Sequence, residues 1–220
     1  MKVKTLLSAA RELAALAYLG YPENPSFSLI SVRYSLSDKD LFALKKIVRW
    51  PEEAISNSLK KISPELAFGK EIRVDGYNVL GTIQAIIEEQ PIFLSNDGYV
   101  RDITSAYRSF HQREVSDRTI ELLLKELERI NPREVLILFD QPVSKSGELS
   151  ARVRNLLRST ELRGDARTEK SVDFEVSRGE ISASSDVAVI RKAKAVLDLP
   201  GLVGESLGVK PFRFWKDYEL

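Results

Sequence analysis

From residue 71 onwards, the sequence alternates short apolar runs with segments of helical periodicity. The runs "IRVDGY" (72–77) and "EVLILFD" (134–140) predict strands, and "PIFL" (91–94) predicts a short extended piece. Helices are predicted at 78–90, 117–130, 147–160 and 186–193. The charged stretch 163–170 is interpreted as a surface connection. Two further runs, at 171–177 and 180–184, precede the last of these helices. A last strand is predicted at 195–199. This alternation predicts an α/β fold with a mostly parallel sheet flanked by helices.

Residues 1–68 lack this alternation and predict a small helical domain before the α/β domain of residues 69–220. Helices are expected in 4–19 and 51–62, with two more around the turn "SLSD", where Ser37 or Asp38 would be the cap. The pair around this turn resembles a helix-turn-helix, although such pairs are common in domains that never contact DNA. Its candidate phosphate contacts are Arg33, Lys39, Lys45, Lys46 and Arg49.

Composition narrows the possible chemistry. The chain has no Cys and a single His, which excludes disulfides, thiolate zinc sites, a Cys nucleophile and His-based metal clusters. Any metal site must use oxygen ligands, which favour magnesium, manganese or calcium. The balance of 33 Lys plus Arg against 32 Asp plus Glu does not by itself indicate a nucleic-acid partner. No run approaches the length of a membrane span, so we expect a cytoplasmic protein with no membrane partner.

Acidic residues follow three of the predicted strands. Asp75 follows "IRV", Asp140 follows "EVLILF" and Asp186 follows "EISASS". Ligands of open parallel sheets bind beyond the carboxyl ends of the strands, where these side chains would converge. Three converging carboxylates repel one another unless something positive lies among them, and a divalent metal is the simplest candidate. The alternative is structural: Asp75 with Gly76 could form a turn, and Asp140 could cap the next helix.

Dinucleotide and Walker-type glycine motifs are absent, and Tyr77 stands where a haloacid-dehalogenase-type phosphatase has its second Asp. The motifs "VDGYN", "LILFD" and "ASSDVAVI" resemble those of the PIN-like nuclease superfamily, including its NYN branch, over roughly residues 70–200. The helical N-terminal region also resembles a two-domain family found mainly in archaea, which implies an architecture but no activity.

The PIN-like resemblance implies a magnesium- or manganese-dependent nuclease, in which bound metal activates a water for attack on a phosphodiester bond. Asp75, Asp140 and Asp186 would be the catalytic metal ligands, and Asn78 would orient a ligand or a metal-bound water. Asp102 is the preferred fourth ligand, with Asp97, Glu88 and Glu89 as alternatives.

Basic residues near the same edge are candidates for binding the substrate. Arg101 would orient it, and the backbone contacts would come from Arg108, Arg113, Lys145 and Arg152. For each of them the alternative is an ion-paired surface residue. The expected partner is RNA or another single-stranded nucleic acid, and a homo-oligomer is left open. Two other functions remain open: a non-catalytic nucleic-acid-binding module and a structural partner in a larger assembly. The aromatic tail 211–220 is expected to pack onto its own domain.

Overall fold

The computed structural model describes residues 3–103 and 115–217. Its centre is a four-stranded sheet in the order β5-β4-β1-β6, in which every neighbouring pair is parallel. Its strands are β1 (Glu71–Asp75), β4 (Glu134–Asp140), β5 (Gly164–Glu169) and β6 (Ile181–Ala183). A separate antiparallel hairpin consists of β2 (Ile92–Leu94) and β3 (Val100–Asp102). The predicted α/β class with a parallel sheet is therefore confirmed.

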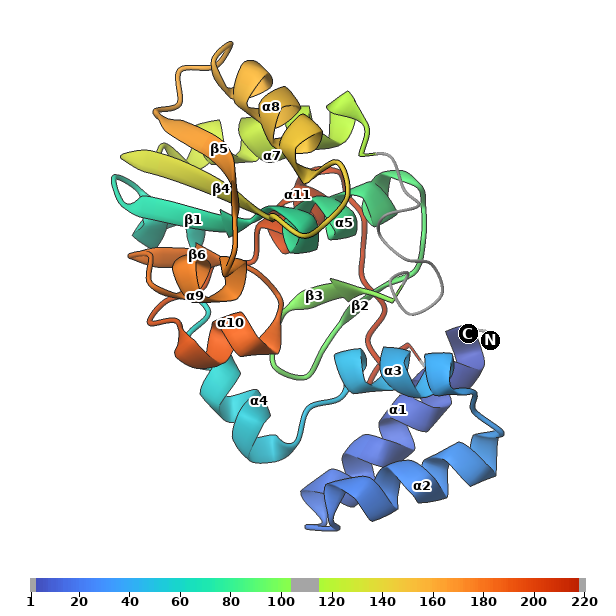
Figure 1. Ribbon diagram of the computed structural model, residues 1–220. Coiled ribbons are helices and arrows are strands. Elements are labelled where there is room, and N and C mark those ends of the chain that lie inside the picture. The colour runs from blue at the N-terminus through green and yellow to red at the C-terminus, as the bar shows by residue number, and fades with distance from the viewer. Residues whose placement is uncertain (1–2, 104–114, 218–220) are drawn as a thin grey trace.

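Helices cover both faces of the sheet (Figure 1). One face packs against α5 (Gly76–Ile87), α7 (Asp117–Ile130), α8 (Ser146–Leu157) and α11 (Leu199–Ser206). The other face packs against α9 (Val172–Ser177) and α10 (Val187–Lys192). In β4, Ile137 and Phe139 belong to the first core, and Leu138 belongs to the second. A strand buried on both faces explains the unbroken apolar run that predicted it.

Two predictions for the C-terminal half were wrong. The stretch 163–170 is not a surface connection, because it contains β5, which pairs with β4 from Gly164 to Glu169. β5 is an edge strand in which Ala166 alone is buried, so it carries charged residues and lacks an apolar run. The run 195–199 is not a strand, because Val196 forms only isolated bridges with Lys61 and Ser182 before α11 begins.

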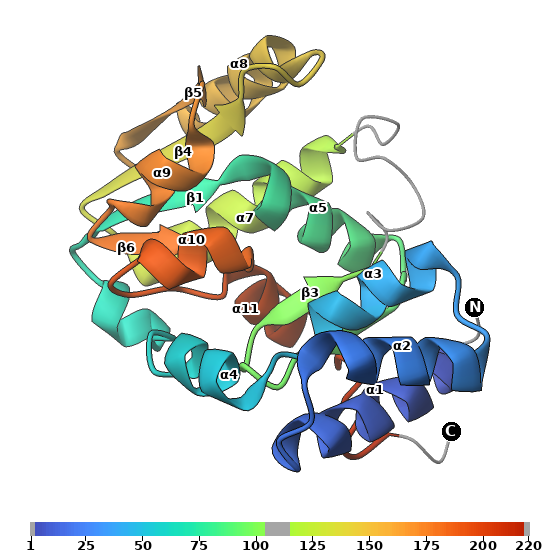
Figure 2. The same ribbon diagram turned by 60° about the horizontal axis from the view of Figure 1, so that its bottom comes forward.

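The predicted helical N-terminal region is confirmed. It contains α1 (Val3–Tyr18), α2 (Glu23–Tyr34), α3 (Asp38–Ile47) and α4 (Pro51–Ser58), followed by the short 3₁₀ helix η1 (Pro64–Ala67). Ser37 caps α3 through a capping box with Asp40. Figure 2 shows α4 below α10, apart from the group formed by α1 to α3.

The core of α1 to α3 is shared with distant parts of the chain. Phe93, Ile103 and Phe214 are buried in the same cluster as the apolar residues of these three helices. The aromatic tail was predicted to pack onto its own domain, and the Phe212 ring does lie 5.7 Å from the Phe93 ring. Phe214 instead packs into the core of α1 to α3, and Tyr218 lies outside the described residues. None of the helices that the structure describes has both the length and the apolar character needed to span a lipid bilayer.

Candidate functional site

Asp75 lies at the point where β1 ends and α5 begins. Its Oδ1 accepts a hydrogen bond from the backbone N–H of Asn78 (3.2 Å), so the residue caps α5. Its Oδ2 accepts a hydrogen bond from the Ser184 hydroxyl (3.0 Å). The residue is only 6% exposed. The capping role weighed for Asp75 is therefore present, and it uses one of the two carboxylate oxygens.

The surroundings of Asp75 disfavour its charged form. The pKa of Asp75 is raised to about 7, mainly by burial and in smaller part by the negative charges of Asp186 and Asp173. The hydrogen bonds from Asn78 and Ser184 act in the opposite direction without cancelling the effect. A carboxyl group of this kind can hold a proton near neutral pH or exchange it for a cation.

The loop after β6 positions Asp186. The Asp186 N–H donates to the Ser184 hydroxyl (3.0 Å). The side-chain Oδ1 of Asn78 accepts from both the N–H (2.8 Å) and the hydroxyl (3.0 Å) of Ser185. Asp186 is exposed and accepts from the N–H of Ala188 (2.7 Å), which caps α10. The side chain of Asn78, predicted to orient a ligand, therefore fixes the loop that holds Asp186.

Asp140 is the last residue of β4, and its side chain is half-buried. Burial raises its pKa. The nearby Tyr77 hydroxyl has its pKa raised to about 12 by burial and by the charge of Asp140, against a hydrogen bond with Ser146. The Tyr77 ring stands edge-on to Phe139, with 5.3 Å between ring centroids. Asp140 does not cap α8, because Lys145 occupies the N-cap position.

Asp173 is the acid that sequence reasoning missed. It lies in the first turn of α9, where burial raises its pKa and the charges of Asp186 and Asp140 raise it further. Lys192, in the last turn of α10, lowers the pKa of Asp173. Asp173 is therefore electrostatically coupled to all three predicted aspartates. We call Asp75, Asp140, Asp173 and Asp186 the aspartate cluster.

The hairpin β2–β3 uses Asp97 and Arg101 in a structural role. The Arg101 guanidinium donates to both carboxylate oxygens of Asp97 (2.6 and 2.8 Å), and Asn57 Nδ2 donates to the same carboxylate (3.0 Å). Asp97 is fully buried and Arg101 is 3% exposed. Asp97 is therefore not a metal ligand beside Asp75, and the prediction that Arg101 contacts substrate was wrong because its guanidinium lies inside the protein.

The other candidates for a fourth ligand lie along α5, away from Asp75. Glu88 and Glu89 follow the carboxyl end of this 12-residue helix, about 18 Å from its start at 1.5 Å per residue. Asp102, the preferred candidate, accepts a hydrogen bond from the Thr82 hydroxyl (3.1 Å), roughly 10 Å along the helix. The structure therefore places Asp173, rather than any of these, with the strand-end acids.

The basic residues predicted to contact nucleic acid are dispersed. Arg152 donates to Asp117 (2.5 Å) and to the carbonyl of Val115 (2.9 Å), which ties α8 to the start of α7. Lys145 is exposed before α8 and has a positive φ of 63°. Arg108 and Arg113 lie outside the described residues. Arg33 of the helix pair binds Glu12 (2.7 Å), so its charge is already compensated.

The donor atoms of the aspartate cluster suit Mg²⁺ or Mn²⁺, because both prefer carboxylate oxygens. Within residues 3–103 and 115–217, none of the four carboxylates forms an ion pair. In the same part of the chain, no three acidic or His side chains are gathered closely enough to form a ready-made metal site. The cluster therefore supplies suitable ligands, and its geometry is wider than a closed metal centre.

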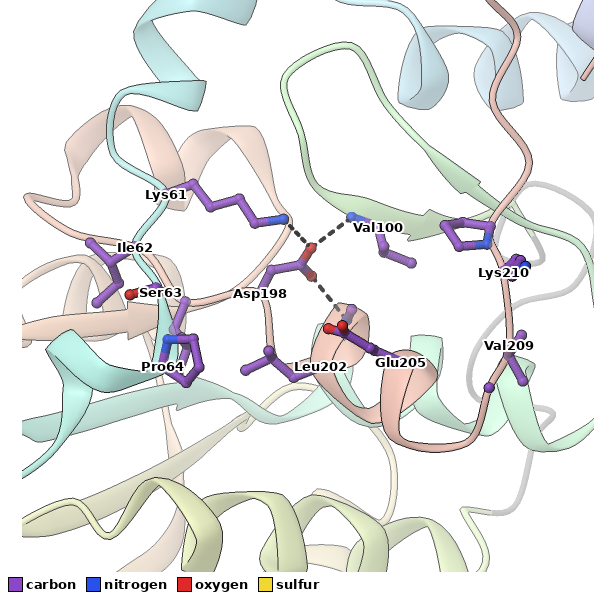
Figure 3. Close-up of a pocket in the computed structure, with 14 residues that line it drawn as sticks. Lys61, Ile62, Ser63, Pro64, Val100, Asp198, Leu202, Glu205, Val209 and Lys210 are labelled. Atoms are coloured by element: carbon purple, nitrogen blue, oxygen red, sulfur yellow. Dashed lines mark hydrogen bonds and ion pairs between the residues drawn. The ribbon is translucent and has the colours of Figure 1, made fainter. Parts of the chain in front are cut away.

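A pocket lies away from the aspartate cluster (Figure 3). Its volume is about 470 Å³, and it is lined by the segment 61–64, α11 and the segment 208–211. At its wall, Asp198 accepts hydrogen bonds from Lys61 Nζ (2.8 Å), Val100 N–H (3.0 Å) and Gly201 N–H (3.2 Å). Because this buried carboxylate is fully paired, it serves the fold.

Comparison with known proteins identifies a family. Residues 64–202 match a family described as "Domain of unknown function (DUF5616)". The chain is also 32% identical over 183 residues to "Uncharacterized protein MJ0935" of Methanocaldococcus jannaschii, which covers 82% of this chain and 87% of that protein. No solved structure matches the chain. Because the family match spans more than half of the sequence, the protein belongs to the DUF5616 family.

Proposed function

We propose that this protein is a metal-dependent nuclease of PIN-like type that hydrolyses phosphodiester bonds in single-stranded RNA. The observation that carries the proposal is the buried Asp75 carboxyl, whose pKa is raised to about 7 beside two other carboxylates. Strongly perturbed carboxyl groups at the carboxyl edge of a parallel sheet are typical of ligand and catalytic sites. The alternation of strands and helices places Asp75 and Asp140 on adjacent strands at this edge.

In this proposal, Asp75, Asp173 and Asp186 would hold Mg²⁺ or Mn²⁺, with Asp140 on the adjacent strand. Such an ion would lower the pKa of a bound water and neutralise charge on the leaving oxygen. Ser184 holds one oxygen of Asp75, while Asn78 fixes the loop that carries Asp186. Asp173 is exposed, and the neighbouring charges of Asp186 and Asp140 help to raise its pKa, so a bound cation would relieve this repulsion.

The test is manganese-dependent cleavage of a fluorescently labelled single-stranded RNA. Asp75→Asn should reduce the cleavage rate by about a thousandfold or more, because it removes a metal ligand while preserving shape. Glu134→Gln is the matched control, since Glu134 is an exposed acid at the opposite end of β4 and should leave the rate unchanged. Equal cleavage by wild type and Asp75→Asn would show that a contaminant or another site is responsible.

A non-catalytic nucleic-acid-binding module is the second candidate. The open spacing of the carboxylates within the described residues favours it, because a working two-metal site brings its ions to about 4 Å. Calorimetric titration with Mn²⁺ separates the two functions. Binding of Mn²⁺ that is lost in Asp75→Asn supports the nuclease, whereas RNA binding without Mn²⁺ binding or turnover supports the module.

A further inference from the structure

The carboxyl end of α3 is fixed on the β2–β3 hairpin. Arg49, just after α3, donates its backbone N–H to the Asn96 side-chain carbonyl (2.8 Å). Asn96 Nδ2 in turn donates to the Arg49 carbonyl (2.8 Å), so one side chain binds both backbone groups of Arg49. Lys46, in the last turn of α3, donates from Nζ to the Asp102 carbonyl (3.3 Å). These contacts attach the end of α3, which carries Lys46 and precedes Arg49, to the β2–β3 hairpin.

The same strand contacts the loop that carries Asp186. Arg101, the neighbour of Asp102 in β3, donates from Nε to the Ser185 carbonyl (2.9 Å). In both ribbon views β3 lies between α3 and α10, whose cap is Asp186 (Figures 1 and 2). The end of α3 and the Asp186 loop are therefore attached to adjoining residues of one strand.

Charge coupling agrees with this placement. Burial lowers the pKa values of both Lys46 and Arg49, and the positive charge of Arg101 lowers them further. The negative charge of Asp186 acts on both residues in the opposite direction. Both cations therefore lie within electrostatic range of Asp186, one member of the aspartate cluster.

The Arg49 guanidinium is only loosely bound by the protein. Its Nε is buried and has no hydrogen-bond partner among the described residues. Its Nη1 is 3.9 Å from Glu53, which is the limit of an ion pair, and the side chain is 17% exposed. A buried donor without a partner costs free energy, so the protein does not fully satisfy this guanidinium. An anionic ligand would meet the part of the side chain that is exposed.

We infer that Lys46 and Arg49 bind a phosphate of the RNA beside the aspartate cluster, so that the helical region forms one wall of the site. This inference rests on the proposed function, because a phosphodiester must be the ligand of the cluster. A polyanion approaching four carboxylates is repelled unless cations lie close by. Arg presents a planar fork that matches phosphate oxygens, and Lys supplies a compact charge. The role of α3 is then to hold these cations at the site, in place of entering a DNA groove.

The experiment measures binding of a fluorescein-labelled eight-nucleotide oligouridine by anisotropy in EDTA, where no cleavage occurs. The double variant Lys46→Gln, Arg49→Gln should bind about tenfold more weakly than wild type. The slope of log affinity against log salt concentration should become shallower by about 0.7 in this variant. That is the slope expected for one neutralised phosphate of a single strand. The matched control is Lys125→Gln, which removes the charge of an exposed lysine on α7, outside the helical region. It should change neither quantity.

Unchanged affinity and salt slope in the double variant would overturn the inference. So would an equal loss in Lys125→Gln, or an absence of oligouridine binding by wild type. If the double variant does not fold, the charge-preserving single variants Lys46→Arg and Arg49→Lys provide the test. Both charge-preserving variants should keep the wild-type salt slope, whereas the single variant Lys46→Gln should have a shallower slope. If RNA binding depends on Lys46 but the protein never cleaves RNA, the proposed nuclease activity is rejected, while the inferred contact between Lys46 and a phosphate stands.

Discussion

Two buried aspartates show how differently the hairpin and the sheet edge treat a carboxylate. Asp97 in the hairpin is fully buried and binds Arg101 through two hydrogen bonds. Burial would raise the pKa of Asp97, but Arg101 and Asn57 outweigh it, and the pKa lies below its ordinary value. Asp75 at the sheet edge receives only an N–H and a hydroxyl, and its pKa rises to about 7.

The difference separates a structural carboxylate from a candidate functional one. A buried charge with its counterion inside the fold is complete, and removing either partner is strongly destabilising. A buried carboxyl group without a cation remains able to bind one, at a cost in stability while it is ionised. The following changes test this contrast in order of decreasing effect.

Arg101→Met should destabilise the fold by about 3–5 kcal/mol, because it leaves the buried Asp97 charge without its partner. Urea denaturation at pH 7 measures the change. Arg152→Met removes a partner from the surface pair with Asp117 and should cost less than about 1 kcal/mol. Similar losses in the two variants would remove the distinction between the hairpin pair and an ordinary surface pair.

Asp75→Asn should change the pH dependence of stability. Because the folded pKa of Asp75 is raised to about 7, its contribution favours folding below pH 4 and is lost as the pH rises towards 7. The stability of Asp75→Asn relative to wild type should therefore increase by up to about 4 kcal/mol across this interval, which is the free-energy equivalent of the pKa difference. Urea denaturation in EDTA at several pH values measures it. A pH-independent difference would mean that Asp75 ionises normally.

Gly76→Ala tests the packing directly behind Asp75. A Cβ at this position would overlap the buried Phe139 ring, which should cost about 1–3 kcal/mol of stability. Gly147→Ala in α8 is the matched control, because no atom lies within 4 Å of its added methyl group. The helix propensity of Ala should leave this control equal to or slightly more stable than wild type. Thermal unfolding of both variants decides whether the sheet edge is closely packed.

Asp173→Asn should have the smallest effect. Removal of its charge should lower the pKa of Asp75, although burial is the larger cause of the raised value. We expect the pH profile attributed to Asp75 to shift towards acid, with a change in stability below about 1 kcal/mol. The measurement compares the stability of the single variant Asp173→Asn with that of the double variant that carries both Asp173→Asn and Asp75→Asn. Their difference as a function of pH gives this shift. An unshifted profile would place Asp173 outside the aspartate cluster.

The sheet edge could be predicted from sequence because β4 is buried on both faces and β1 alternates buried apolar residues with partly exposed charged ones. The apolar run of β4 stops at Phe139, so the sequence itself shows where the strand ends, and Asp140 is the last residue of the strand. β1 is also apolar enough to identify, so Asp75 is placed by the same rule. A parallel sheet then brings the two ends to one edge without any knowledge of tertiary contacts.

Asp173 and Arg101 could not be assigned in this way. Asp173 lies in a six-residue helix in which Val172, Phe174 and Val176 alternate with polar residues, a pattern typical of strands. Arg101 is fixed by Asp97 and by the Ser185 carbonyl, which is 84 residues away in the sequence. Periodicity misassigns a short helix with a strand-like pattern and does not reveal a hydrogen bond between residues far apart in the sequence, so only the structure shows these roles.

Because α1 to α3 share their core with the α/β unit, the matched family domain exposes apolar surface when it occurs without these helices. The family match covers residues 64–202 and so includes Phe93 and Ile103 but none of α1 to α3. These two side chains are buried by the N-terminal helices and by Phe214. A protein that carries the α/β unit without these helices must therefore cover the same apolar surface with another partner. The helical region and the α/β unit are thus expected to evolve as a pair.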